Sequence, residues 1–204
     1  MLSELNKDSQ VKRDLLQKMQ IMEAARLVFQ QHGFFKASID DIAKQALKSR
    51  TTLYKYYKNK DQIFEDFILL EVTEIIALAA AAIGTAASLE TKLHHYNVKK
   101  LELLRLKYAT YTLAASEMME ETVHFCFCQQ QISLAETVVI KKIFQESIDQ
   151  HEIKYIAPTE LDFLISVITL ALRGIEHEAV SSAENVNLEE RLKWLVGILV
   201  SGLK

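Results

Sequence analysis

The first sixty residues contain apolar positions at the period of an α-helix. Five of them keep the i, i+3, i+4, i+7, i+8 spacing of one helix face: Ile21, Ala24, Ala25, Val28 and Phe29. This spacing predicts a helix from about residue 12 to residue 31. Gly33 follows directly, and glycine is the residue that most often ends a helix.

Two shorter helices are predicted next. Ser38 is suited to cap a helix N-terminus, and Asp41 stands where the acidic partner of a capping box belongs. Ser49 offers a second cap, for a helix from 50 to about 58 whose inward residues are Leu53 and Tyr57. A long helix followed by two short ones and a tight turn is typical of a helix-turn-helix head.

The rest of the chain also has helical periodicity. The pattern predicts helices over about 60–82, 90–111, 129–151, 158–181 and 188–203, with an irregular region at 114–128. One Pro and five Gly in 204 residues are too few for a protein built on turns and strands. We therefore expect an all-α fold of about nine helices, with a head at residues 1–60 and a helical body at 61–204.

The charge is divided unevenly between these two parts. Residues 1–60 contain twelve Lys and Arg against six Asp and Glu, a net charge of +6, whereas the remainder has a net charge of −9. A basic head on an acidic body indicates that a polyanion binds at one end.

The third predicted helix has an unusual outer face. With Leu53 and Tyr57 inward, the outward and flanking side chains are hydroxyls, amines and aromatic rings, which suit a DNA groove better than a plain solvated face. The candidate contacts to double-stranded DNA are Arg50, Thr51, Thr52, Tyr54, Lys55, Tyr56 and Lys60, with Ser38 at the start of the preceding helix.

The stretch from Ile21 to Phe64 resembles the DNA-binding head of the tetracycline-repressor (TetR) family. The matching residues are Ile21, Ala24, Ala25, Phe29, Gly33, Phe34, Ser38, Ile42, Ala43, Ser49, Leu53, Tyr54, Tyr57, Lys60 and Phe64. One departure is Leu47, where the family usually has Gly in the turn; a Leu there requires either a reshaped turn or a left-handed conformation. Ala37 replaces a common Thr and leaves Ser38 as the expected phosphate donor at that helix start.

The resemblance implies a homodimeric regulator, a repressor that a small-molecule effector releases from its operator. The last two helices would form the dimer interface through Ile168, Leu195 and Leu199, and the alternative is an ordinary hairpin within one chain. The body would enclose a pocket, and the alternative is a filled core. The candidate lining residues, which suit an apolar or amphipathic ligand, are Phe67, Tyr108, Tyr111, Met118, His124, Phe125 and Arg173. Arg173 also suits an ion pair with a Glu.

A different class of function rests on His124 and Cys128, which share a helix face and could bind a metal in a helical metal-binding protein or enzyme that does not bind DNA. No third ligand is evident, so we assign no metal site and no cofactor. The chain has no Walker loop, GxGxxG, GxSxG or HExxH motif, so we expect no enzyme. Two cysteines, no signal peptide and a longest apolar run of 15 residues predict a cytoplasmic protein without a membrane segment.

Overall fold

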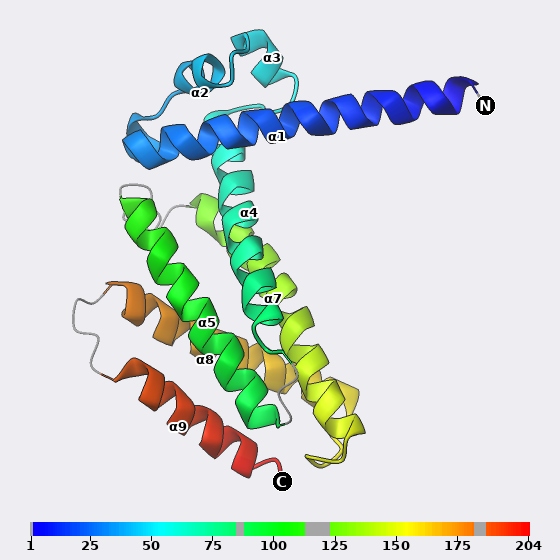
Figure 1. Ribbon diagram of the computed structural model, residues 1–204, viewed down its shortest axis with the longest axis vertical. Coiled ribbons are helices and arrows are strands. Elements are labelled where there is room, and N and C mark those ends of the chain that lie inside the picture. The colour runs from blue at the N-terminus through cyan, green and yellow to red at the C-terminus, as the bar shows by residue number, and fades with distance from the viewer. Residues whose placement is uncertain (1, 85–87, 113–122, 182–186) are drawn as a thin grey trace. The chain divides into compact units, whose positions relative to one another are not determined.

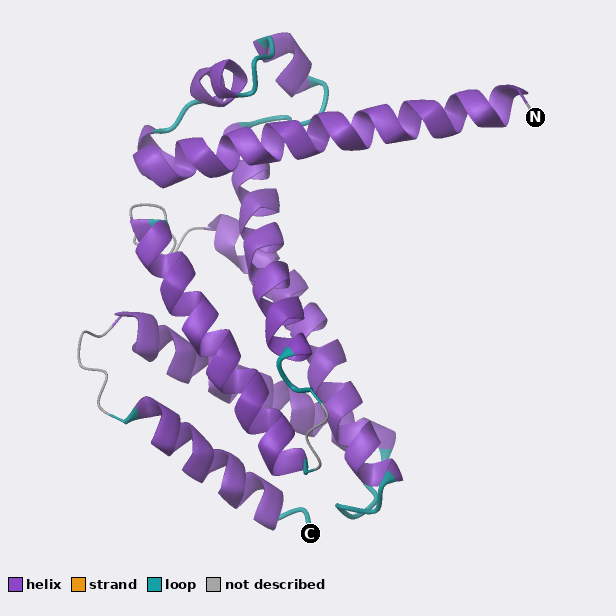
Figure 2. Cartoon of the chain, in the orientation of Figure 1, coloured by secondary structure: helices purple, strands orange, loops and turns teal. Residues whose placement is uncertain are grey.

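The computed structural model describes residues 2–84, 88–112, 123–181 and 187–204, and describes side chains within 9–84, 88–112, 130–176 and 187–204. These residues contain eight helices and no strand (Figure 1, Figure 2). The helices are α1 (Leu2–Lys36), α2 (Ile39–Gln45), α3 (Arg50–Tyr54), α4 (Lys60–Ala81), α5 (Leu89–Thr110), α7 (Val123–Asp149), α8 (Pro158–Ser181) and α9 (Leu188–Ser201). The all-α prediction is confirmed. No helix among these residues is long and apolar enough to cross a membrane.

The chain forms two compact units. Unit 1 consists of Met1–Leu70 and Thr110–Cys128, and unit 2 consists of Glu71–Ala109 and Gln129–Lys204. The sequence predicted a boundary at residue 60 between a DNA-binding part and a ligand-sensing part. The division into compact units does not test this functional boundary, which stays a prediction.

Unit 1 is built around the apolar face of α1. Ile21, Ala25 and Phe29 are fully buried there, as the spacing predicted. Gly33 has a positive φ of 71°, which interrupts the helical geometry near the end of α1. The helix begins earlier than predicted, at Leu2, because the residues before 12 contain no Gly or Pro to end it.

Aromatic rings fill the centre of unit 1. Phe29 lies 5.0 Å from Phe64 and 5.3 Å from Phe67 between ring centroids, and Phe67 lies 5.1 Å from Tyr111. Edge-to-face and tilted pairs at such distances stabilise a core beyond the area that they bury. The cluster fixes the start of α4 against α1.

Unit 2 has a separate apolar core made by α5, α7, α8 and α9, together with the end of α4. Its fully buried members include Leu89, Tyr96, Ile140, Phe144 and Ile165. Val196 and Val200 of α9 join the same cluster, so the last helix packs against its own chain. Every helix of unit 2 therefore uses one face for this core.

Candidate nucleic-acid interface

The first short helix of the head begins with the predicted capping box. Ser38 Oγ accepts a hydrogen bond from the Asp41 amide at 3.2 Å, and Asp41 Oδ2 accepts one from the Ser38 amide at 3.0 Å. The Ser38 hydroxyl also donates to Asp41 Oδ2, and this bond, followed by that of the Ser38 amide, lowers the pKa of Asp41 below its ordinary value. α2 therefore starts at a fixed residue.

The turn between the two short helices contains the strained residue that the sequence indicated. Leu47 has a φ of 53° and is 94% exposed. The Lys48 amide donates to Ala43 O at 2.9 Å and the Leu47 amide to Lys44 O at 3.1 Å, which is the Schellman pattern with leucine in the position usual for glycine. The turn thus keeps its shape, and Leu47 carries the strain.

The second short helix presents the outer face expected of it. Ser49 Oγ caps α3 by accepting from the Thr52 amide at 3.1 Å, and Leu53 and Tyr57 are buried as predicted. Thr51, Tyr54 and Lys55 are exposed. The helix ends at Tyr54, a turn earlier than expected, although the Tyr57 amide still donates to Leu53 O at 2.9 Å.

Two of the expected donors, exposed Arg50 and half-buried Tyr56, are held by aspartates of other helices. Arg50 Nε lies 2.8 Å from Asp40 Oδ1, at the start of α2. The Tyr56 hydroxyl donates to Asp14 Oδ1 of α1 at 3.0 Å. Sequence reasoning missed both aspartates, because no local spacing connects residues 10 or 42 positions apart.

Lys60 does not lie as expected for a phosphate contact. Its ammonium donates to Phe34 O at 2.6 Å, Ala37 O at 2.9 Å and Phe35 O at 3.4 Å, and lies 4.2 Å from the centre of the Phe34 ring. A lysine has three N–H donors, and all three are used at the end of α1. A DNA contact by Lys60 would require one of these bonds to break, and that contact stays a prediction.

Ser38 is occupied in the same way. Its hydroxyl donates to Asp41 Oδ2 at 2.5 Å, which uses the one O–H donor that a serine has. In this arrangement Ser38 holds the start of α2 and has no proton left for a phosphate. The expected donors that remain outward are those of α3.

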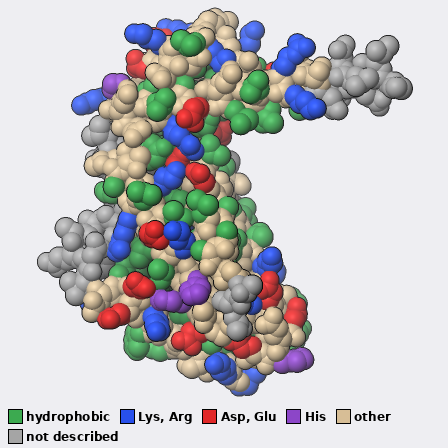
Figure 3. All heavy atoms as spheres, in the orientation of Figure 1, with side chains coloured by type: hydrophobic (Ala, Val, Ile, Leu, Met, Phe, Trp, Pro, Cys, Tyr) green, Lys and Arg blue, Asp and Glu red, His purple; other side chains and the backbone are tan. Residues whose placement is uncertain are grey.

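Lys and Arg side chains are spread over the helices of unit 1 on the face drawn in Figure 3. Residues 21–67 match the family model described as bacterial regulatory proteins, tetR family. Residues 21–67 are therefore a DNA-binding head of the TetR family. The chain is a DNA-binding transcriptional regulator.

Similar proteins are also transcriptional regulators. The HTH-type transcriptional regulator YhgD of Bacillus subtilis is 23% identical over 152 residues, or 74% of this chain and 80% of that protein. The fatty acid metabolism regulator protein of the same species is 26% identical over 136 residues, or 67% and 70% of the two chains. The crystal structure of the regulator FadR from Bacillus subtilis in complex with stearoyl-CoA has a TM-score of 0.64 at 22% identity, covering 91% of this chain and 99% of that one. At that identity the structural likeness supports the fold.

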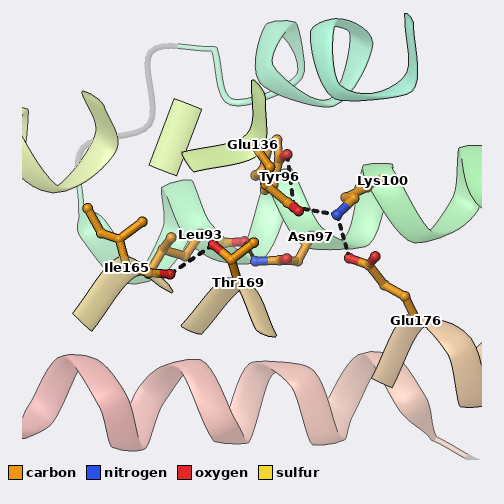
Figure 4. A network of polar contacts seen from close by, with 8 residues as sticks. All are labelled: Leu93, Tyr96, Asn97, Lys100, Glu136, Ile165, Thr169 and Glu176. Atoms are coloured by element: carbon orange, nitrogen blue, oxygen red, sulfur yellow. Dashed lines mark hydrogen bonds and ion pairs between the residues drawn. The ribbon is translucent and has the colours of Figure 1, made fainter. Parts of the chain in front are cut away.

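The body of this regulator contains a buried polar network (Figure 4). The Lys100 ammonium contacts Glu136 and lies 2.8 Å from Glu176 Oε1, and the Tyr96 hydroxyl donates to Glu136 Oε1 at 3.2 Å. Lys100 is 2% exposed and Glu136 0%. Burial, followed by the charge of Glu136, raises the pKa of Glu176, and Lys100 opposes the rise. Both Lys100 and Glu136 occupy apolar positions of their helices, a signal in the sequence that we did not use.

The described residues among those expected to line a ligand pocket are divided between the two units. Phe67 and Tyr111 are buried against each other in unit 1. Tyr108 and Arg173 are half-buried in unit 2, where the charge of Arg173 acts on Glu176. Met118 and the side chains of His124, Phe125 and Cys128 lie outside the described residues, so the pocket and the metal hypothesis stay untested.

The expected dimer residues differ in their exposure. Ile168 is buried in the core of its own chain, and Leu199 packs partly against that core. Leu195 is 36% exposed. A second, outward apolar face on α8 consists of Phe163, Val167 and Leu170, and α9 exposes Trp194 and Ile198. Because α8 is apolar all round, the sequence could not tell which face was outward.

Proposed function

We propose that this regulator is a cytoplasmic homodimer that represses transcription by placing α3 in the DNA major groove. The observation that carries the proposal is α3 itself, a capped helix that is buried through Leu53 and exposes Thr51, Tyr54 and Lys55. We assign it no enzymatic activity, cofactor or metal. Arg50, Thr52 and the ring of Tyr56, whose hydroxyl donates to Asp14, complete the proposed DNA-contacting set.

The contacts of α3 are tested with DNA selected by the protein. Wild-type protein first enriches binding sites from a library of random double-stranded DNA. Thr51→Ala is then expected to change the preferred sequence, because a threonine can contact base edges. Lys55→Ala is expected to weaken binding to all sequences and to reduce the salt slope by about 1, as the loss of one phosphate contact does. Unchanged binding by both variants would remove α3 from the interface.

We further propose that the effector is an amphipathic molecule with a long acyl chain. Two relatives support this choice, one named for fatty acid metabolism and one bound to stearoyl-CoA. Stearoyl-CoA is expected to release the protein from its selected DNA, whereas coenzyme A alone is not. Equal effects of the two compounds would contradict an acyl-chain effector.

The homodimer is supported by the outward apolar face of α8. Isolated exposed apolar residues are ordinary, but Phe163, Val167 and Leu170 follow one another at i, i+4, i+7. A two-fold dimer also matches what helix-turn-helix proteins require, since two recognition helices read half-sites one turn apart.

A further inference from the structure

Asp40 holds Arg50 at the first residue of α3. The carboxylate accepts from Arg50 Nε at 2.8 Å. Arg has five N–H donors, so the terminal nitrogens keep donors for another acceptor. Both partners are more than half exposed, and an exposed pair of this kind adds little to stability. Its effect is to orient the guanidinium.

Asp14 holds Tyr56 just beyond the end of α3. Its Oδ1 atom accepts from the Tyr56 hydroxyl at 3.0 Å and from Gln10 Nε2 at 3.2 Å. The hydroxyl proton is thereby used, and the contact fixes the direction of the ring. Asp14 lies in the first part of α1, which precedes the residues 21–67 that match the family model.

Two further contacts connect the same part of α1 to the turn before α3 and to the residues just after α3. Lys48 Nζ donates to Gln20 Oε1 at 2.8 Å, and the Lys18 ammonium lies 5.9 Å from the centre of the Tyr57 ring. Two successive turns of α1 therefore contact the segment that runs from the turn before α3 to the residues just after it. The early part of α1 is thus a support for that segment.

We propose that Asp14 and Asp40 are positioning residues that set the sequence specificity of DNA binding, by holding Tyr56 and Arg50 in the arrangement that the operator recognises. This inference rests on the proposed function of α3. A carboxylate beside a DNA-binding surface repels phosphates and lowers affinity for every sequence. Because Arg50 and Tyr56 are already ordered by the two aspartates, they lose less conformational entropy when they bind a DNA site that matches their arrangement. The aspartates therefore favour the operator over other DNA.

The test compares three substitutions that each remove one negative charge from unit 1. Asp14→Asn and Asp40→Asn replace the carboxylates, and Glu23→Gln is the control, since Glu23 pairs with Arg26 on its own helix. Dissociation constants are measured for the selected operator and for a random duplex of equal length, over a range of salt concentrations. Melting temperatures verify that all variants fold.

We expect all three variants to bind the random duplex somewhat more tightly than wild type. The ratio of operator to random affinity is expected to fall about three- to tenfold for Asp14→Asn and Asp40→Asn, and to stay unchanged for Glu23→Gln. When Arg50 is already replaced by alanine, adding Asp40→Asn should change the operator-to-random ratio no further. When Tyr56 is already replaced by phenylalanine, adding Asp14→Asn should likewise have no further effect.

Other outcomes overturn the inference. A parallel loss on both duplexes indicates structural damage, and an equal change in Glu23→Gln indicates a general charge effect. A ratio that still falls when Arg50 or Tyr56 is already replaced removes the positioning role. If wild-type protein binds no duplex, the proposed function fails as well, whereas a selective wild type with unaltered variants leaves that function intact.

Discussion

Leu47 is the clearest single-residue strain in the head. At a φ of 53° the Cβ atom of a non-glycine residue lies too close to the backbone, which destabilises the fold. The Leu47 side chain is too exposed to offset this strain by packing. We expect Leu47→Gly to raise the free energy of unfolding by about 1 kcal/mol. Urea denaturation measures this, with Leu47→Ala as control because alanine keeps Cβ. An equal gain in both variants would show that strain is not the cause.

Lys60 is expected to act on stability rather than on DNA. Lys60→Met leaves the carbonyls of Phe34 and Ala37 without their charged donor, which should lower the free energy of unfolding by about 1–3 kcal/mol. The salt slope of DNA binding should not change. Lys58→Met, at an exposed position, is the control for stability. A reduced salt slope with unaltered stability would restore the phosphate contact that the sequence suggested.

At the scale of elements, the two short helices differ in how their caps respond to pH. Ser38→Ala should lower the free energy of unfolding by about 1 kcal/mol at pH 7. The folded-state pKa of Asp41 is lowered by Ser38, so this stabilisation exists above the ordinary pKa of aspartate and is lost as pH falls through the folded value. The cost of Ser38→Ala should therefore shrink between pH 5 and pH 3. Ser49→Ala is the control, because its α3 cap involves no carboxylate.

Local signals predicted the elements well. The caps Ser38 and Ser49, the break at Gly33 and the left-handed Leu47 all depend on neighbours within five residues, and the structure bears them out. Helix ends without such a signal were misplaced, as at the start of α1.

Contacts between distant residues could not be read in this way. The partners of Lys60 are more than twenty residues away, and that of Tyr56 is 42 residues away. Their meeting depends on how α1 packs against α3 and α4. The same holds for α8, where periodicity shows an apolar helix but not which side, that of Ile168 or that of Leu170, faces its own core.

At the scale of the whole molecule, we expect the outward face of α8 to form the proposed dimer interface. Leu170 is 71% exposed in the single chain, so a charge there costs the monomer little but leaves an unpaired ion in an apolar interface. Leu170→Glu should therefore give folded monomers, which light scattering detects by their mass. These monomers should also bind the operator poorly. Leu106→Glu, at a 61% exposed position of α5, is the matched control. A Leu170→Glu protein that remains dimeric would place the interface elsewhere.

The buried network links the stability of the whole body to pH. Two carboxylates share the ammonium of Lys100, and burial disfavours the ionised form of Glu176, so its pKa is raised in the folded state although 17% of its side chain stays exposed. A carboxyl with a raised pKa stabilises the fold fully below its unfolded pKa, near 4.3, and this contribution is lost as pH rises through the folded value. Glu176→Gln keeps the side-chain shape and removes the titration.

We therefore expect the stability of Glu176→Gln relative to wild type to increase as pH rises from 4 to 8. Urea denaturation at several pH values measures the difference in unfolding free energy. Glu102→Gln, whose exposed carboxylate pairs with Lys99, should show a flat difference over the same range. A difference that instead declines with pH would mean that Lys100 outweighs burial and holds Glu176 ionised. The network would then stabilise the body as an ion pair at neutral pH, because the charge of Lys100 would more than offset the desolvation of Glu176.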